Sequence, residues 1–156
     1  MSGQIITAVL GLPINKDNKF LLTKRHAPGK KYWHNKWQFA GGGLNHGETV
    51  EDGLLRELWE ELHVKATIIY PHPIVKTRIL TKQNSDEAGE ATIVLMLYLV
   101  DIGYQKANLS HDPDWETSDW GWFTHDEVKK LDALPMTMDF IDDAQRLIDN
   151  KTILSL

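Results

Sequence analysis

Three glutamates fall at a spacing that could gather carboxylates for metal chemistry. Residues i, i+3 and i+4 of an α-helix share one face, so Glu57, Glu60 and Glu61 would lie side by side. Neighbouring like charges repel one another unless water or a cation neutralises them, and carboxylate oxygens are ligands that suit Mg²⁺ and Mn²⁺. Taken alone, an acidic triplet is more typical of a solvated helix surface. The surrounding residues must therefore decide whether it indicates a metal site.

The segment that carries these glutamates predicts a helix from about residue 50 to residue 62. Thr49 is the expected N-cap, and acidic residues follow in the first turn. Gly53, one turn before Glu57, lowers helix propensity, so we expect its missing side chain to leave room for a ligand. Four leucines on the opposite face should pack against a sheet and hold the glutamates on a rigid element: Leu54, Leu55, Leu58 and Leu62.

The residues around this helix resemble the signature of the Nudix hydrolase family, Gly-x5-Glu-x7-Arg-Glu-(aliphatic)-x-Glu-Glu-x-Gly-(aliphatic). The chain matches the glycine and polar positions of its first part with the same gaps: Gly42, Glu48, Arg56, Glu57, Glu60 and Glu61. His63 stands where the family has its second glycine, and the aliphatic Val64 follows. Because that glycine ends the helix, we expect His63 to take the left-handed conformation, which histidine tolerates better than most residues.

The resemblance implies an α/β fold, an α/β/α sandwich with a mixed β-sheet, and hydrolysis of a diphosphate linkage with Mg²⁺ or, in its place, Mn²⁺. It implies that the carbonyl of Gly41 joins the three helix glutamates around the metal, with Glu57 and Glu60 as our first candidates for the general base. Arg56 and Glu48 match positions that support the site, since an Arg–carboxylate pair can orient a metal-binding glutamate. A metal ion would lower the pKa of a bound water, and a neighbouring carboxylate could accept its proton.

In the Nudix family a further acidic metal ligand usually comes from a loop ahead of a Trp-Phe pair. Glu116 precedes Trp122 and Phe123, so it resembles the downstream glutamate of the family and is our candidate metal ligand. The competing reading for each loop acid is an ordinary solvated charge. Three aspartates in the same loop are alternatives to Glu116: Asp112, Asp114 and Asp119.

Tryptophans and basic residues near the expected site could bind the substrate. A nucleobase could stack on an indole, and a basic loop provides a positive field for phosphate. Our candidates are Arg25, Trp33, Trp115 and Trp120, whereas Trp37 and Trp122 are more typical of a core. Nearby histidines lack zinc-site spacing, and we treat them as incidental: His26, His34 and His46.

Length and composition limit the class of protein. The 156 residues contain no linker-like stretch, so we expect residues 1–156 to form a single domain. The net charge of −5 argues against a nucleic-acid polymer as partner, and no apolar run is long enough to predict a membrane span. The first residues do not resemble a secretory signal, so a cytoplasmic location is the default expectation, with a homodimer left open.

Patterning outside the helix predicts the elements that complete the fold. Thr124 and Glu127 form a capping box that opens a helix to about residue 131, and a helical apolar face after Pro135 extends to about residue 150. Strands are expected at residues 4–10, 20–22, 37–40, 66–80 and 91–101.

The sequence therefore predicts a Mg²⁺-dependent pyrophosphohydrolase that cleaves a diphosphate linkage in a small nucleoside diphosphate-X substrate. The segment from Asp112 to Phe123 is similar to that of Nudix members that sanitise nucleoside triphosphates, which favours a (d)NTP or modified nucleotide. The alternatives are a nucleotide-sugar or other NDP-X hydrolase, and a catalytically silent Nudix domain that binds nucleotides or regulates. An isopentenyl diphosphate isomerase would be expected to need a catalytic cysteine, and the chain has no cysteine.

Overall fold

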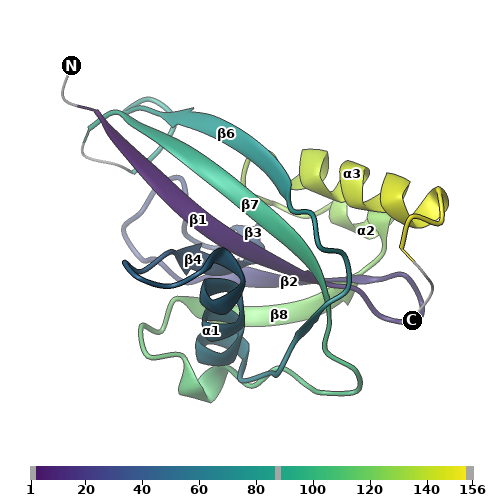
Figure 1. The fold of residues 1–156 in the computed structure, drawn as a ribbon. Coiled ribbons are helices and arrows are strands. Elements are labelled where there is room, and N and C mark those ends of the chain that lie inside the picture. Colours follow the sequence, from purple (N-terminus) through teal and green to yellow (C-terminus); the bar gives the residue numbers. More distant parts are fainter. Residues whose placement is uncertain (1–2, 87–88, 154–156) are drawn as a thin grey trace.

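Two β-sheets lie between helices in the computed structural model, which describes residues 3–86 and 89–153 (Figure 1). In the larger sheet β1 runs parallel to β7, and the other pairs are antiparallel. The order of its strands is β4-β1-β7-β5, and β6 also pairs with β7. The bounds of these strands are β1 Gln4–Pro13, β4 Ala40–Gly43, β5 Thr67–Ile68, β6 Ile74–Leu80 and β7 Ala91–Asp101. The smaller sheet has the order β3-β2-β8: β2 Phe20–Arg25, β3 Trp37–Gln38 and β8 Thr117–Phe123.

The helices cover opposite sides of these sheets, which confirms the predicted α/β/α sandwich with a mixed sheet (Figure 1). The helices are α1 Val50–Leu62, α2 His125–Val128 and α3 Thr137–Asp149, and a short 3₁₀ helix, η1, spans Leu109–His111. None of the helices in the described part of the chain is long and apolar enough to cross a membrane.

Alternating residues of the central strands divide the core between the two sides. On one side Leu12, Leu97 and Leu99 pack with Phe140 and Ile141 of α3. On the other side strand residues pack with the apolar face of α1: Val9, Tyr98, Val100, Leu54, Leu58 and Leu62. This alternation follows from the two-residue period of a strand and fixes α1 firmly against the sheet.

Two predictions about α1 are wrong. Leu55 is 38% exposed, so it does not belong to the buried face. Gly53 does not leave room for a ligand, because a β-carbon there would lie 2.5 Å from the Leu44 side chain and 3.0 Å from Glu48 Oε1. Glycine at position 53 instead lets the loop before the helix pack closely on it.

Most predicted elements are present, although β1 and β2 each extend three residues further than expected and α2 ends at Val128 instead of about residue 131. Three other predictions differ more from the structure. The expected strand at 66–80 is broken into β5 and β6 around Pro71 and Pro73, which interrupt a ladder of backbone hydrogen bonds. The strand expected at 37–40 is split at Phe39, and the glycines that follow it belong to β4. We did not predict β8, whose sequence TSDWGWF mixes polar residues and glycine with tryptophans.

One face of the larger sheet carries exposed apolar side chains. Ile5, Val75 and Ile79 are 76%, 54% and 56% exposed. The register aligns Ile5 with Thr92 and Thr92 with Ile79, so the two isoleucines share one row across β1, β7 and β6. We call this surface the isoleucine row.

Candidate active site

Both ends of α1 are fixed as the sequence predicts. The Thr49 side chain accepts a hydrogen bond from the Asp52 N–H at 3.1 Å. At the other end His63 lies in the left-handed region, with φ 55° and ψ 42°, and its N–H donates to the Trp59 carbonyl at 2.9 Å. The predicted left-handed conformation of His63 is confirmed, and its ring stacks on His111 of η1 with centroids 4.1 Å apart.

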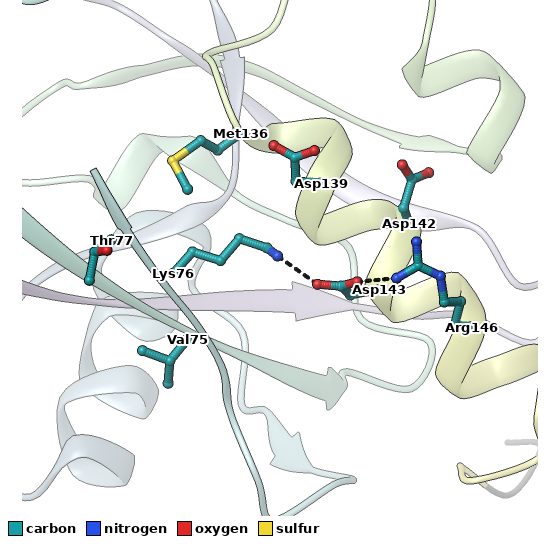
Figure 2. Close-up of a pocket in the computed structure, with 8 residues that line it drawn as sticks. All are labelled: Val75, Lys76, Thr77, Met136, Asp139, Asp142, Asp143 and Arg146. Carbon is teal, nitrogen blue, oxygen red and sulfur yellow. Dashed lines mark hydrogen bonds and ion pairs between the residues drawn. The ribbon is translucent and has the colours of Figure 1, made fainter. Parts of the chain in front are cut away.

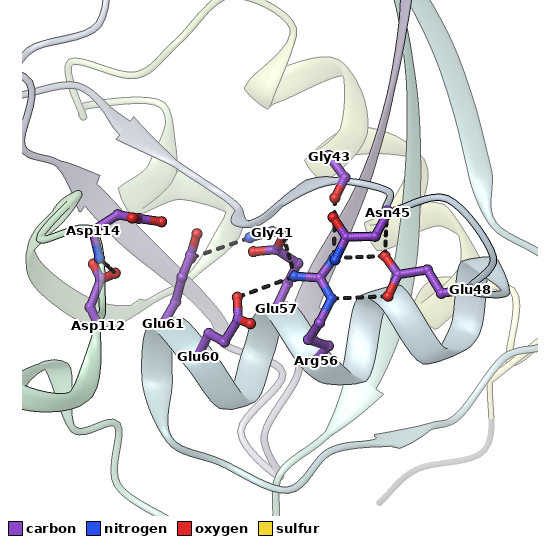
Figure 3. A network of polar contacts seen from close by, with 10 residues as sticks. All are labelled: Gly41, Gly43, Asn45, Glu48, Arg56, Glu57, Glu60, Glu61, Asp112 and Asp114. Carbon is purple, nitrogen blue, oxygen red and sulfur yellow. Dashed lines mark hydrogen bonds and ion pairs between the residues drawn. The ribbon is translucent and has the colours of Figure 1, made fainter.

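Arg56 lies at the centre of a network of acidic groups (Figure 3). Its Nε and Nη2 donate to the two carboxylate oxygens of Glu48 at 3.0 and 2.7 Å, a bidentate arrangement. Nη1 donates to Glu57 at 2.9 Å and to Glu60 at 3.1 Å. Nη2 also reaches the Gly43 carbonyl at 3.2 Å, so the guanidinium connects α1 to the end of β4.

The Arg56 pair strongly favours the ionised form of Glu48. The hydrogen bond from Arg56, followed by the one from the Asn45 N–H, lowers the pKa of Glu48 to about 2. In turn the same pairing raises the pKa of Arg56. Glu48 and Arg56 therefore stay charged at any physiological pH and form a fixed support beside Glu57.

Glu61 differs from the other glutamates of α1, because it is buried, with 6% of its surface exposed. Its carboxylate accepts one hydrogen bond, from the Gly41 N–H at 3.3 Å. Burial, and then the charge of Glu57, raises the pKa of Glu61 well above its usual value. Burial also raises the pKa of Glu57, although the hydrogen bond from Arg56 opposes this. The outward-facing triplet expected from the sequence is therefore partly wrong, and Glu61 is an under-neutralised carboxyl inside the protein.

The glycines of β4 let its backbone lie close to β1 and to the carboxylate of Glu57. Gly41 has φ 143°, and a β-carbon there would lie 2.1 Å from the Val9 carbonyl oxygen. At Gly42 a β-carbon would meet the Glu57 carboxylate at 2.8 Å. Glycine is therefore required at position 41 by the backbone, and at position 42 it provides space for Glu57.

The loop before β8 brings Glu116 near the helix glutamates. The Glu116 charge contributes to raising the pKa of both Glu57 and Glu61. Its carboxylate lies 3.4 Å from the Arg25 guanidinium, and its carbonyl accepts from the His26 N–H at 2.6 Å. Arg25, the last residue of β2, and His26, which follows it, thus hold Glu116 close to the end of this strand.

Asp112 organises this loop from inside the protein. It is buried, and its carboxylate accepts hydrogen bonds from the backbone N–H groups of Asp114, Glu116 and Thr117 at 3.1, 2.9 and 3.1 Å. Asp112 is therefore not a solvated loop charge, and the interpretation of it as one is wrong. With its oxygens engaged by the backbone, Asp112 serves to position Glu116.

Comparisons with known proteins agree with this arrangement. The model of the NUDIX domain family matches residues 5–142, which is most of the chain. This protein belongs to the Nudix hydrolase family. A relative named nucleoside triphosphatase NudI, from Enterobacter sp. (strain 638), is 30% identical over 121 residues, covering 77% of this chain and 84% of the relative.

Other similarities are shorter or structural. An RNA pyrophosphohydrolase from Psychrobacter cryohalolentis is 54% identical to this Nudix hydrolase, but over 33 residues that cover 21% of this chain and 19% of that protein. The solution structure of the E. coli ORF135 protein superimposes with a TM-score of 0.70 at 22% identity and covers 96% of this chain and 95% of that one. The latter likeness supports the fold.

The metal ligands expected from the Nudix resemblance lie in one region, but their side chains do not form a complete metal-binding site in this arrangement. Within residues 3–86 and 89–153, no three His, Asp or Glu side chains are gathered in a way that could hold a metal ion as they stand. Arg56 occupies oxygens of Glu57 and Glu60, which explains part of this. Glu61 fits a cation best, because its ionised carboxylate would be buried with a single hydrogen bond to compensate the charge.

The candidate substrate residues of this Nudix hydrolase have different surroundings. Arg25 lies over the Trp33 ring, with its guanidinium carbon 5.6 Å from the centroid, and pairs with Glu116. Trp120 packs against the α1 side of the core, as does Trp122. Trp115 is 70% exposed and has a positive φ of 54°. The sequence analysis did not single out Thr117 and treated His26 as incidental, but Thr117 pairs with Arg25 across the strands and His26 follows Arg25 in the chain.

Proposed function

We propose that this protein is a Mg²⁺-dependent pyrophosphohydrolase that cleaves a diphosphate linkage in a nucleoside diphosphate-X, with a (d)NTP or modified nucleotide as substrate. The chain would act as one catalytic unit over residues 1–156. The similarity to a protein named nucleoside triphosphatase, which extends over 84% of that protein, supports this choice of substrate class.

The observation that carries the proposal is the burial of the Glu61 carboxyl group, which accepts one hydrogen bond. A carboxylate that is removed from water and accepts one hydrogen bond costs free energy unless a cation compensates it. Glu57 and Glu116 add negative charge around it. A divalent cation would relieve this repulsion, and oxygen ligands of this kind suit Mg²⁺, with Mn²⁺ as a substitute.

The residues that would hold the ion are Gly41 through its carbonyl, Glu57, Glu60, Glu61 and Glu116. A bound divalent ion would neutralise charge on the phosphate oxygens and would lower the pKa of a bound water toward neutral pH. Arg56 engages one oxygen of Glu57 and one oxygen of Glu60, which leaves the second oxygen of each carboxylate for the ion.

The protein side chains would then divide the remaining work. Glu57 or Glu60 accepts the proton of the attacking water as its oxygen bonds to phosphorus and the bridging P–O bond breaks. Arg56, held by Glu48 through two hydrogen bonds, orients these glutamates. Arg25 is close enough to Glu116 to place a positive charge beside the phosphates.

A substrate panel tests the proposal. Purified protein is given dNTPs, NTPs and nucleotide sugars with Mg²⁺, and the release of phosphate, pyrophosphate and nucleoside monophosphate is scored separately, because a nucleotide sugar yields a monophosphate and a sugar phosphate. We expect pyrophosphate from nucleoside triphosphates, no turnover in excess chelator, and recovery on adding Mg²⁺ or Mn²⁺. Full activity in chelator would contradict the mechanism, and preference for nucleotide sugars would favour that alternative.

Matched variants separate catalysis from a silent binding role. Glu57→Gln, Glu60→Gln and Glu61→Gln remove a charge at nearly constant size, whereas Glu51→Gln changes an exposed glutamate of the same helix that hydrogen-bonds Tyr98. We expect the first three to lose turnover and the control to retain it. If wild-type protein binds nucleotides without hydrolysing any of them, the binding or regulatory role replaces our proposal.

A further inference from the structure

Strand β6 lies at an edge of the larger sheet. It pairs with β7 on one side, and no other strand of the described chain pairs with it. In an antiparallel ladder every second residue directs its backbone groups toward the neighbouring strand, so the remaining residues of β6 direct theirs outward. The Ile79 carbonyl accepts a hydrogen bond from the Asn84 side chain at 3.1 Å, which indicates that Ile79 belongs to the outward set. Thr77 and Val75, two and four residues earlier, belong to the same set.

The outward backbone groups of Val75 and Thr77 are available to another chain. Within residues 3–86 and 89–153 they have no hydrogen-bond partner, and both side chains are exposed. β6 keeps a regular register over its seven residues without the proline or bulge that commonly blocks an edge strand. Lys76, whose charge could also block the edge, is held on the α3 side by Asp143. Such an edge is a template for an added strand.

A groove lies beside this edge, between β6 and α3 (Figure 2). It is a cavity of about 590 Å³, and its β6 wall consists of three consecutive residues, Val75 to Thr77. The opposite wall is formed by residues of α3 from Met136 to Arg146. We call this cavity the β6–α3 groove. A chain extended along the edge of β6 would therefore have α3 beside one of its faces.

The α3 wall gives the groove an excess of negative charge. Three aspartates, one lysine and one arginine line the groove. Lys76 and Arg146 both bind Asp143. Asp142 pairs with a histidine of α2, and Asp139 is exposed and forms no ion pair with any described residue. The groove therefore favours a basic partner and disfavours the phosphates of a nucleic acid or a lipid.

The two faces of β6 differ in chemistry. Because side chains alternate along a strand, Val75 and Ile79 are exposed on the face of the isoleucine row, whereas Lys76 points to α3. Residues directly opposite each other on paired strands share a face. An added strand would therefore place every second side chain beside apolar residues and the others beside the aspartates of α3.

We propose that the β6–α3 groove binds an extended peptide segment of another protein, which adds to β6 as a further strand and alternates apolar with basic residues. Its apolar side chains continue the isoleucine row, and its basic side chains lie near Asp139 and Asp142. The groove is on the α3 side of the sandwich and α1 is on the other, so this inference does not rest on the proposed function.

A second copy of the chain fits this edge less well. Pairing of two β6 strands about a twofold axis would place both α3 helices on the same side of the joined sheet. Their acidic walls would then lie near each other, and each copy carries a net charge of −5. Charge complementarity therefore favours a basic segment of a different protein.

Fluorescence anisotropy with labelled seven-residue peptides, the length of β6, tests the groove on the full chain. The peptide Val-Lys-Val-Lys-Val-Lys-Val has the proposed alternation. One control, Val-Glu-Val-Glu-Val-Glu-Val, reverses the charge, and another, Val-Val-Lys-Lys-Lys-Val-Val, keeps the composition without the alternation. We expect the alternating basic peptide to bind at least about tenfold more tightly than either control. Equal affinity for the basic peptide and the rearranged control would overturn the proposal.

Backbone methylation of the peptide tests strand addition separately from charge. Methyl groups on the amide nitrogens of either the valines or the lysines remove alternate N–H donors. An added strand pairs with β6 through one of these two sets, because the other set points away from it. One methylated peptide should therefore lose binding while the other keeps it. Equal affinities of the two methylated peptides would contradict strand addition.

A matched pair of variants on α3 tests the acidic wall. Asp139→Asn removes a charge from the groove at nearly constant size, and Asp149→Asn removes the same charge from the same helix outside the groove. We expect the first to weaken binding of the basic peptide about threefold or more and the second to leave it unchanged. Neither should alter the melting temperature or nucleotide turnover. Equal effects on affinity would mean that the peptide responds to net charge and would overturn the groove.

Proline substitutions test the edge itself. Thr77→Pro removes an outward N–H, so it should abolish peptide binding with little change in melting temperature. Lys76→Pro removes an N–H that bonds to β7, so it should lower the melting temperature. If Thr77→Pro also unfolds the protein, Asp139→Asn and the methylated peptides still decide the proposal.

Sedimentation of the free protein distinguishes a peptide from a second copy. We expect Thr77→Pro to leave the mass of the protein in solution unchanged. A wild-type dimer that dissociates in Thr77→Pro would show that a second copy occupies the edge, and would overturn the peptide proposal. These measurements do not require hydrolysis, so their failure and the failure of the proposed function are separate outcomes.

Discussion

Arg56 divides the glutamates around α1 into two electrostatic groups. Glu48 shares two hydrogen bonds with it, and Glu57 and Glu60 share its Nη1. Glu61 lies outside this network and accepts a single hydrogen bond from the backbone. One guanidinium therefore compensates part of the negative charge at the proposed metal site, and the glutamate that it does not reach, Glu61, is the most buried of the three on α1.

The raised pKa of Glu61 predicts a pH-dependent stability in the metal-free protein. Because folding favours the protonated carboxyl, its contribution is fully present below the usual pKa of 4.5 and is lost as pH rises through the higher folded value. Glu61→Gln imitates the protonated form, so it should melt higher than wild type at neutral pH in chelator. Thermal melts across pH 4 to 8 measure this difference.

The same melts contain two internal checks. Below pH 4.5 the difference between wild type and Glu61→Gln should shrink, and Mg²⁺ at neutral pH should stabilise wild type more than the variant. Glu48 acts in the opposite direction, since its pKa of about 2 means that its contribution is lost as pH falls from 4.5 toward 2. Parallel melting curves for wild type and Glu61→Gln would contradict our account of Glu61.

Adjacent glycines should respond differently to the same added methyl group. Gly41→Ala places a β-carbon against the Val9 backbone in a conformation that alanine avoids, so we expect a loss of about 3 kcal/mol or more in unfolding free energy. Gly42→Ala meets the end of the flexible Glu57 side chain, which can move away. The second variant should fold normally but lose turnover, as measured by denaturant titration and kinetics on both proteins.

At the scale of elements, α1 separates stability from chemistry by its faces. Leu58→Ala should cost about 2 to 5 kcal/mol, because Leu58 is fully buried against Gly11 and the core. Leu55→Ala should cost less than about 1 kcal/mol, because Leu55 is substantially exposed. Urea titrations compare the two. The surviving folded fraction of each variant should keep its turnover, and equal losses of stability would contradict the assigned faces.

The end of α1 is a second test at this scale. His63→Gly relieves a left-handed histidine, which favours stability by up to about 1 kcal/mol, but it also removes the ring that stacks between Trp59 and His111. We expect these effects to offset each other, leaving the melting temperature nearly unchanged and turnover intact. His63→Ala loses the stack without relieving the strain, so it should be less stable. A large loss of turnover in His63→Gly would assign the imidazole a direct role.

Local sequence signals predicted the elements with clear periodicity or capping. Thr49, His63 and the capping box of Thr124 mark helix ends through interactions within a few residues, and all three are present in the structure. β8 was missed because its pairing with β2 joins residues far apart in the chain, and its own composition does not alternate.

The candidate site was proposed from residue spacing, whereas its electrostatics required the fold. The family pattern identified Glu57, Glu60 and Glu61, but the burial of Glu61 depends on the approach of β4 and of the loop before β8. The anchoring role of Asp112 likewise depends on how that loop closes. Tertiary contacts that span tens of residues leave no signal in local composition.

At the scale of the whole molecule, α1 joins parts of the chain that are distant in sequence. The Arg56 network connects it to β4, and the ring of His63 connects it to η1. The candidate metal ligands therefore come from elements packed on one helix, while α3 covers the other side of the sandwich (Figure 1). A ligand bound at α1 should stabilise both sheets together.

The isoleucine row on β1 and β6 has a consequence for behaviour in concentrated solution. The chain has a sequence pI of about 5.8, so copies lose their mutual repulsion near that pH while Ile5 and Ile79 remain exposed. We expect a solubility minimum close to pH 5.8, measurable by light scattering against concentration. Ile79→Lys should raise solubility there, whereas Leu55→Lys, which exchanges an exposed leucine on α1 for the same charge, should help less. Equal effects of the two substitutions would show that net charge alone governs precipitation. A buffer well above pH 5.8 would then be enough to keep any variant soluble.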